Sequence, residues 1–139
     1  MDIDCMKQIN DYFGHLAGDQ TILKISQILR EMDSIEDKIF SGRIGGDEFI
    51  SIFEGFNVEQ TKKIALFYME RLQKIFPLKE QFPDLMCSVS YGIKEIKKST
   101  TIDEARYLVD KAMYDMKKPG KSKKLRELEK LALTYSSLI

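Results

Sequence analysis

Hydrophobic residues recur every three or four positions in several segments of the chain. This spacing gives a helix one apolar face that can pack against a core. Polar and charged residues fill the other positions and indicate faces in contact with water. The pattern therefore predicts helices over residues 7–13, 20–32, 58–75, 101–116 and 125–138.

Polar residues before three of these segments predict where the helices begin. Asn57 followed by Gln60, and Thr101 followed by Glu104, have the spacing of a capping box. In that motif the first side chain bonds a backbone N–H in the first turn, and the second reaches back to the cap. Asp19 is expected to cap the helix over residues 20–32, after a loop over residues 14–18.

Shorter apolar or alternating segments predict strands at residues 1–5, 38–40, 49–53 and 86–96. Gly45 and Gly46 lie between the second and third of these, and two glycines favour the tight turn of a β-hairpin. Gly92 indicates a bulge or a close approach of another segment. The order is strand, helix, helix, strand, strand, helix, strand, helix, helix. It predicts an α+β fold, a ferredoxin-like or palm-like sandwich with a mainly antiparallel central sheet flanked by helices.

Composition adds mainly exclusions. The chain has 139 residues, 43% hydrophobic and 32% charged, with a formal net charge of zero. Such a balance suits one soluble domain and gives no reason to expect nucleic-acid or membrane contact. The two cysteines, Cys5 and Cys87, fit no zinc or redox spacing, which favours reduced thiols and a cytoplasmic location.

Acidic residues at the hairpin and on the first strand are candidates for metal binding. Asp47 and Glu48 follow the two glycines directly. Asp2 and Asp4 alternate along the first strand and are expected on one of its faces. If that strand lies beside the hairpin, all four carboxylates come close together, and Mg²⁺ prefers such oxygen ligands. A solvated acidic turn is the alternative reading of the hairpin.

Lys7 begins a short helix directly after the first strand. Helix N-termini present free N–H groups to phosphate, and a lysine adds positive charge there. Acids on two adjacent strands beside a phosphate-binding turn are the arrangement with which polymerase palms bind metal and nucleoside triphosphate. An ordinary solvated lysine is the other reading of Lys7.

Five motifs, in order, resemble the GGDEF domain of bacterial diguanylate cyclases, a cyclase-type palm fold. They are DIDCMKQIND (residues 2–11), Gly14-His15 with Gly18-Asp19, RIGGDEF (43–49), SVSYGI (88–93), and DKAMYDMK (110–117) with Gly120-Lys121. The resemblance covers residues 1–121. The helix that usually opens this domain is absent, so we expect a domain lacking its usual first helix. Residues 122–139 are then a C-terminal amphipathic helix, either a linker or a packing element.

The resemblance implies a nucleotidyltransferase of signal transduction. It would condense two GTP into cyclic di-GMP with release of pyrophosphate, depend on Mg²⁺ (or Mn²⁺), and act as a homodimer under a sensor or regulatory domain. The alternative is a catalytically impaired GGDEF domain that serves a signalling protein as a GTP-binding or dimerisation module. A third reading is a polymerase-like enzyme that acts on another nucleotide.

Catalytic and metal-binding roles follow from the same resemblance. Asp2, the main-chain oxygen of Ile3, Asp47 and Glu48 match the metal ligands. Asp47 and Glu48 are also the catalytic acids, and Glu48 is a candidate general base. Lys7 matches the residue that stabilises charge on the phosphates.

Substrate-binding roles are also implied by the resemblance. Asn10 and Asp19 match the positions that recognise guanine, although Asn10 also reads as an ordinary helix-end residue. His15 matches a position close to the nucleotide, and packing within its loop is the alternative. The remaining implied substrate-binding residues are Cys5, Met6, Gly45, Gly46, Lys117 and Lys121.

Overall fold

The strands and helices follow one another in the predicted order in a computed structural model of the chain. The structure describes residues 1–72, 88–117 and 121–136. Side chains are described for residues 1–72, 88–115 and 125–134. The strands are β1 (Asp2–Ile3), β2 (Ile39–Gly45), β3 (Glu48–Phe53) and β4 (Val89–Ser90). The helices are α1 (Met6–Phe13), α2 (His15–Asp33), α3 (Val58–Leu72), α4 (Ile102–Lys117) and α5 (Lys121–Ser136).

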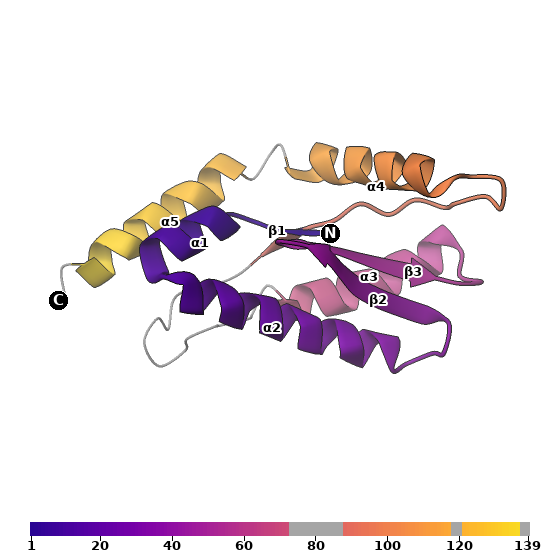
Figure 1. Ribbon diagram of the computed structural model, residues 1–139, viewed down its shortest axis with the longest axis horizontal. Helices are drawn as coiled ribbons and strands as arrows, with labels where there is room; N and C mark the ends of the chain where they lie inside the picture. Colours follow the sequence, from indigo (N-terminus) through magenta and orange to yellow (C-terminus); the bar gives the residue numbers. More distant parts are fainter. Residues whose placement is uncertain (73–87, 118–120, 137–139) are drawn as a thin grey trace.

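The described strands form one antiparallel sheet in the order β2-β3-β1-β4 (Figure 1). The sheet buries one apolar residue from each strand: Ile3, Ile39, Phe49 and Val89. These residues belong to the same buried cluster as side chains of α1, α2, α3 and α5. Helix α4 lies apart from this cluster and packs against β4 (Figure 1). The predicted α+β sandwich is therefore confirmed.

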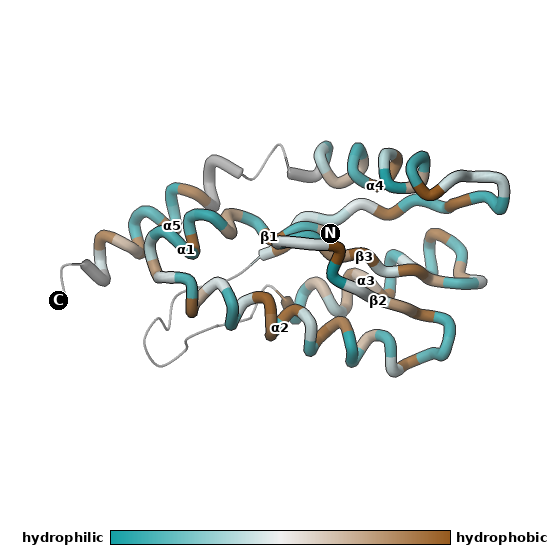
Figure 2. The backbone as a smooth tube through the Cα atoms, in the orientation of Figure 1, coloured by the Kyte–Doolittle hydropathy of each residue, from teal (hydrophilic) through white to brown (hydrophobic). Residues whose placement is uncertain are grey.

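The hydrophobic pattern accounts for the helices that cover this face. In Figure 2, hydrophobic positions recur along α2 and along the β2–β3 hairpin, separated by hydrophilic ones. In α2, Ile25, Leu29 and Met32 are each 3% exposed or less, which confirms the predicted apolar face. Helix α5 reaches the same core through Leu128, which is 7% exposed and belongs to its buried cluster. None of the described helices is both long and apolar enough to cross a membrane.

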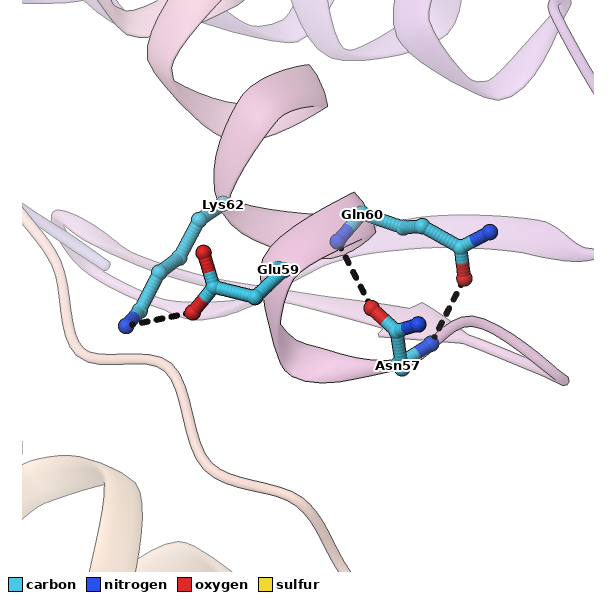
Figure 3. A network of polar contacts seen from close by, with 4 residues as sticks. All are labelled: Asn57, Glu59, Gln60 and Lys62. Atoms are coloured by element: carbon cyan, nitrogen blue, oxygen red, sulfur yellow. Dashed lines mark hydrogen bonds and ion pairs between the residues drawn. The ribbon is translucent and has the colours of Figure 1, made fainter.

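Both predicted capping boxes form. The Gln60 N–H donates to Asn57 Oδ1 at 2.9 Å, and the Asn57 N–H donates to Gln60 Oε1 at 3.0 Å (Figure 3). At the start of α4, the Thr101 N–H donates to Glu104 Oε2 at 2.9 Å, and the Glu104 N–H donates to Thr101 Oγ1 at 3.2 Å. Each box satisfies backbone donors that a helix start leaves without intrahelical partners.

The predicted loop over residues 14–18 is wrong. Helix α2 begins at His15, and Gly14 alone separates it from α1. Gly14 has φ +86°, a conformation that glycine adopts without steric cost, so one residue is enough to redirect the chain. Asp19 therefore lies inside α2 and does not cap it.

The hairpin forms as predicted, but its turn is displaced by one residue. Gly45 pairs with Glu48, so Gly46 and Asp47 form the turn, with Gly46 at φ +52°. A register irregularity between Arg43 and Gly45 takes up the extra residue. The side chain of Arg43 closes the turn, because its Nε donates to the Gly46 carbonyl at 2.8 Å.

The predicted strand over residues 86–96 is too long. Only Val89 and Ser90 pair in the sheet, residues 91–96 are not strand, and residues 86 and 87 are outside the described part. Gly92 is a point of close approach, as predicted. A Cβ added there would lie 2.5 Å from the Val109 carbonyl oxygen in α4.

Candidate active site

Strand pairing brings the hairpin acids beside the first strand. Asp2 of β1 pairs with Glu48 of β3, and the Ile3 N–H donates to the Asp47 carbonyl at 3.1 Å. On the other side of this pair, the Phe49 N–H donates to the Met1 carbonyl at 2.8 Å. The backbone thus gathers Asp2, Ile3, Asp47 and Glu48, the four predicted metal ligands, at one place in the sheet.

The two faces of the sheet differ sharply at this point. Ile3 and Phe49 are 1% and 2% exposed and enter the core. Their neighbours Asp2 and Glu48 are paired across the two strands, so their side chains leave the sheet on the opposite face. Asp2 is half-buried and Glu48 is exposed. A surface that carries both carboxylates therefore lies directly over a buried apolar layer.

A cavity of about 460 Å³ opens on this acidic face. Asp2 and Glu48 line it from the sheet, and residues of α4 line its other side. Lys111 is the cation among these α4 residues. It lines the cavity together with the carboxylates of Asp2, Glu48 and Asp110. The lining residues from α4 are Tyr107, Asp110, Lys111, Met113 and Tyr114.

The acids suit a metal ion that arrives with its substrate. Among the residues described, no group of three or more His, Cys, Asp or Glu side chains is placed to hold a metal. Mg²⁺ needs no such cage, because one or two carboxylates, waters and substrate phosphates complete its six ligands. Asp2 and Asp47 with the Ile3 carbonyl are a donor set of that kind. Their role as ligands stays a prediction.

Asp4 lies on the same face of the sheet as Asp2, as strand alternation predicts, because it bonds Ser90, the residue that pairs with Asp2. It does not line the cavity with Asp2 and Glu48. Strand β1 ends at Ile3, and Asp4 lies in the turn that follows, where it is 7% exposed. Its two carboxylate oxygens accept hydrogen bonds from Ser88 and Ser90. The side chain is therefore turned toward β4, a contact that the local sequence pattern did not indicate.

The turn between β1 and α1 leads directly into the helix at the residues for which phosphate contacts are predicted. Cys5 has φ +57° and ψ 32°, and α1 begins at the next residue, Met6. The first N–H groups of a helix lack intrahelical partners, which makes them available to an anion. Lys7 is exposed in this first turn, and Cys5 and Met6 are half-buried.

Helices α1 and α2 touch at the predicted guanine-binding residues. Gly18 of α2 faces Asn10 of α1 so closely that an added Cβ would overlap Asn10 Oδ1 and lie 2.8 Å from Met6 Cε. Asn10 is half-buried, and Asp19 follows Gly18 in the chain with an exposed side chain. His15 is exposed at the start of α2. Sequence reasoning missed Gly18 as a spacer, although a glycine among helix-forming residues is a usable signal.

Two predicted phosphate contacts cannot be placed. Helix α4 ends at Lys117 and α5 begins at Lys121, so both residues lie near the junction of these helices. Their side chains are outside the described part of the structure. Both residues remain predictions.

A family model agrees with this arrangement. The model of "Diguanylate cyclase, GGDEF domain" matches residues 1–123. The chain belongs to the GGDEF family. Two similar proteins of Escherichia coli K12 are the probable diguanylate cyclases DgcI, 32% identical over 122 residues, and DgcJ, 34% identical over 114 residues. These alignments cover 87% and 82% of this chain but 25% and 21% of the relatives, so this GGDEF chain spans about a quarter of their length or less.

Solved structures support the same fold. The active GGEEF domain of a diguanylate cyclase from Vibrio cholerae aligns with a TM-score of 0.69 at 28% identity, over 86% of this chain and 74% of that one. The diguanylate cyclase SiaD from Pseudomonas aeruginosa, in complex with its activator SiaC, aligns with a TM-score of 0.75 over 86% of this chain and 45% of that one. At 22% identity the second match supports the fold alone.

Proposed function

We propose that this GGDEF domain condenses two molecules of GTP into cyclic di-GMP and releases pyrophosphate in a reaction that depends on Mg²⁺ or Mn²⁺. One observation carries the proposal. The pairing of Asp2 with Glu48 brings acids of two strands together, and β1 then leads directly into the turn at Cys5 and the N-terminus of α1. Acids for a metal and donors for phosphates thus lie a few residues apart. The relatives named as diguanylate cyclases support this choice of reaction.

The metal-binding residues in this proposal are Asp2, Asp47 and the main-chain oxygen of Ile3. A bound metal ion would neutralise charge on the triphosphate. Glu48 is exposed and can accept the proton of the attacking 3′-hydroxyl as a general base, or it can bind the metal. Its neighbour in the cavity, Lys111, is a further cation on this face.

Each condensation step balances simply. The 3′-oxygen of one GTP forms a bond to the α-phosphorus of the other, the bond to pyrophosphate breaks, and the hydroxyl proton passes to the base. Lys7 at the start of α1, with Lys117 and Lys121 from the α4–α5 junction, supplies positive charge to the phosphates. The backbone of Cys5, of Met6 and of the glycine turn surrounds the phosphates.

Guanine recognition falls to polar residues of α1 and α2. Guanine offers an acceptor at O6 and donors at N1 and N2, which suit the amide of Asn10 and the carboxylate of Asp19. The close contact between Gly18 and Asn10 restricts where that amide can lie. His15 is proposed as a contact close to the nucleotide.

Ring closure requires two such sites. Each domain is proposed to hold one GTP, so two copies of the chain must face each other as a homodimer for both hydroxyls to attack. The chain spans about a quarter or less of the length of relatives such as DgcI and DgcJ, and SiaD was solved with an activator protein. We therefore also propose that a sensor or regulatory domain controls this domain, and that it works in the cytoplasm.

A second candidate function uses the same substrate without catalysis. It is that of a catalytically impaired GGDEF domain, which binds GTP or dimerises within a signalling protein. Substrate binding without turnover distinguishes this candidate from the cyclase.

The test is product formation by matched variants. The chain is incubated with GTP and Mg²⁺, and cyclic di-GMP and pyrophosphate are measured by chromatography. Glu48→Gln and Asp47→Asn should abolish product without unfolding the domain. Glu36→Gln, which changes another exposed glutamate outside the site, should not. GTP binding without product favours the second candidate. A chain that neither binds GTP nor forms product contradicts both candidate functions.

A further inference from the structure

Asp4 connects two segments that lie far apart in the chain. Its Oδ2 accepts a hydrogen bond from Ser88 Oγ at 2.7 Å, and its Oδ1 accepts one from Ser90 Oγ at 2.6 Å. The Asp4 N–H also donates to the Ser88 carbonyl at 2.9 Å. We call Asp4, Ser88 and Ser90 the carboxylate clamp. It joins the turn after β1 to the β4 strand.

The carboxylate clamp is a demanding arrangement for a structural contact alone. Asp4 is 7% exposed and Ser90 is 3% exposed, so the carboxylate has left most of its water. A buried carboxylate is tolerated only when strong hydrogen bonds replace that water. Bonds from neutral hydroxyls to a carboxylate are short and strong, and here they fix both oxygens in direction.

The backbone directly after Asp4 needs such support. Cys5 is the only described non-glycine residue with positive φ, and a left-handed conformation is strained for a residue with a side chain. Conformations of this kind persist only where neighbouring structure holds them. On one side of Cys5 the carboxylate clamp holds Asp4, and on the other the Ile9 N–H donates to the Cys5 carbonyl at 2.9 Å.

We propose that the carboxylate clamp positions the turn that binds the GTP phosphates, with Asp4 as the positioning residue. Asp4 follows Ile3, whose carbonyl is a proposed metal ligand, and precedes the first turn of α1, whose N–H groups face the phosphates. Anchoring Asp4 to β4 therefore fixes both groups at once. This inference rests on the proposed function, because it concerns the same substrate.

A second carboxylate in the chain provides a matched control. Asp33, at the end of α2, accepts hydrogen bonds from the Ser41 N–H at 3.0 Å and from Ser41 Oγ at 2.6 Å. This contact joins α2 to β2 of the hairpin and lies away from the proposed phosphate-binding turn. Asp33→Ala thus removes a comparable carboxylate–serine contact and leaves the turn intact.

The first measurement is steady-state kinetics with GTP and Mg²⁺. Asp4→Ala should lower kcat by about 10- to 100-fold, since misplacement of reacting groups by about an ångström costs that much. Asp33→Ala should leave kcat near the wild-type value even if it lowers the melting temperature equally. Ser88→Thr keeps the hydroxyl and should retain the kcat that Ser88→Ala loses. Equal losses in Asp4→Ala and Asp33→Ala would overturn the inference.

The second measurement separates this inference from the proposed function. Amide hydrogen exchange, read by NMR, reports the Asp4 and Ile9 N–H groups without any turnover. Both N–H groups should exchange faster in Ser88→Ala than in the wild type, whereas Asp33→Ala should leave their exchange rates unchanged. GTP should bind more weakly to Ser88→Ala than to the wild type. If the wild type makes no cyclic di-GMP, the proposed function is refuted. The role of the carboxylate clamp is then tested by comparing the hydrogen exchange rates and GTP affinities of the wild type and Ser88→Ala. If Asp4→Ala does not fold, Ser88→Ala carries the kinetic test, and unchanged exchange and kcat in that variant refute the clamp.

Discussion

Replacing Gly92 by alanine should separate α4 from the sheet. The added Cβ would lie 2.5 Å from the Val109 carbonyl oxygen, 2.6 Å from the Met113 backbone nitrogen and 2.8 Å from Ala112 Cβ. Real Cβ atoms essentially never approach such atoms within 3.0 Å. Two of the three obstacles are helix backbone, which cannot rotate away as a side chain can. The helix or the segment after β4 must therefore shift by about half an ångström or more.

Two opposing effects set the magnitude. Overpacking of this kind costs about 1–3 kcal/mol. An alanine also lowers the entropy of the unfolded chain, which returns about 0.4–1 kcal/mol. The net loss in the free energy of unfolding should be about 1–2 kcal/mol. For a chain of this length it corresponds to a melting temperature lower by about 3–8 °C.

Thermal and urea unfolding followed by circular dichroism measure this loss, and Gly42→Ala is the control. Gly42 lies in β2, where an added Cβ meets nothing within 4 Å and φ is not positive. That variant should be as stable as the wild type or slightly more stable. A Gly92→Ala protein with the stability of Gly42→Ala would show that α4 does not approach the sheet as described.

Three further predictions concern helix ends and the last helix. Leu128→Ala should cost about 2–4 kcal/mol in urea unfolding because Leu128 is 7% exposed, whereas Leu133→Ala, at 73% exposed, should cost almost nothing; equal effects would mean that α5 does not pack on the core. Asn57→Ala should lower stability by about 1 kcal/mol through loss of the helix cap, and an unchanged melting temperature would contradict the cap. Bonds from the Thr101 N–H and then its hydroxyl lower the pKa of Glu104 from 4.5, so this stabilisation is present above that pH and is lost as the pH falls through the lower folded value. The melting temperature of Glu104→Gln should therefore lie below that of the wild type at neutral pH and approach it in acid, and a gap independent of pH would refute the effect.

The order of the elements could be predicted because each helix and strand carries its own periodicity. The hairpin and both capping boxes are local, and their residues lie within a few positions of one another. The length of β4 could not be predicted in this way. Residues 86–96 alternate over their whole length, but among the described strands β4 pairs with β1 alone, which has two residues, so the ladder ends at Ser90.

The candidate site also has features that could be predicted from the sequence and features that could not. The meeting of Asp2 with Glu48 follows from a strand order that the sequence suggests. The role of Asp4 does not follow from the sequence, because its serine partners lie more than 80 residues away in the chain. Nothing local distinguishes an acid that binds a metal from one that bonds a neighbouring strand. Gly18 likewise shows its purpose only when α1 lies against α2.

Product stoichiometry tests the central claim most directly. The chain is incubated with GTP and Mg²⁺, and cyclic di-GMP and pyrophosphate are quantified in the same sample, with Glu48→Gln beside it. A diguanylate cyclase releases two pyrophosphates for each cyclic di-GMP formed, and the variant should give neither. Pyrophosphate or phosphate release without cyclic di-GMP, or no product at all from a folded wild type that binds GTP, would contradict the assignment.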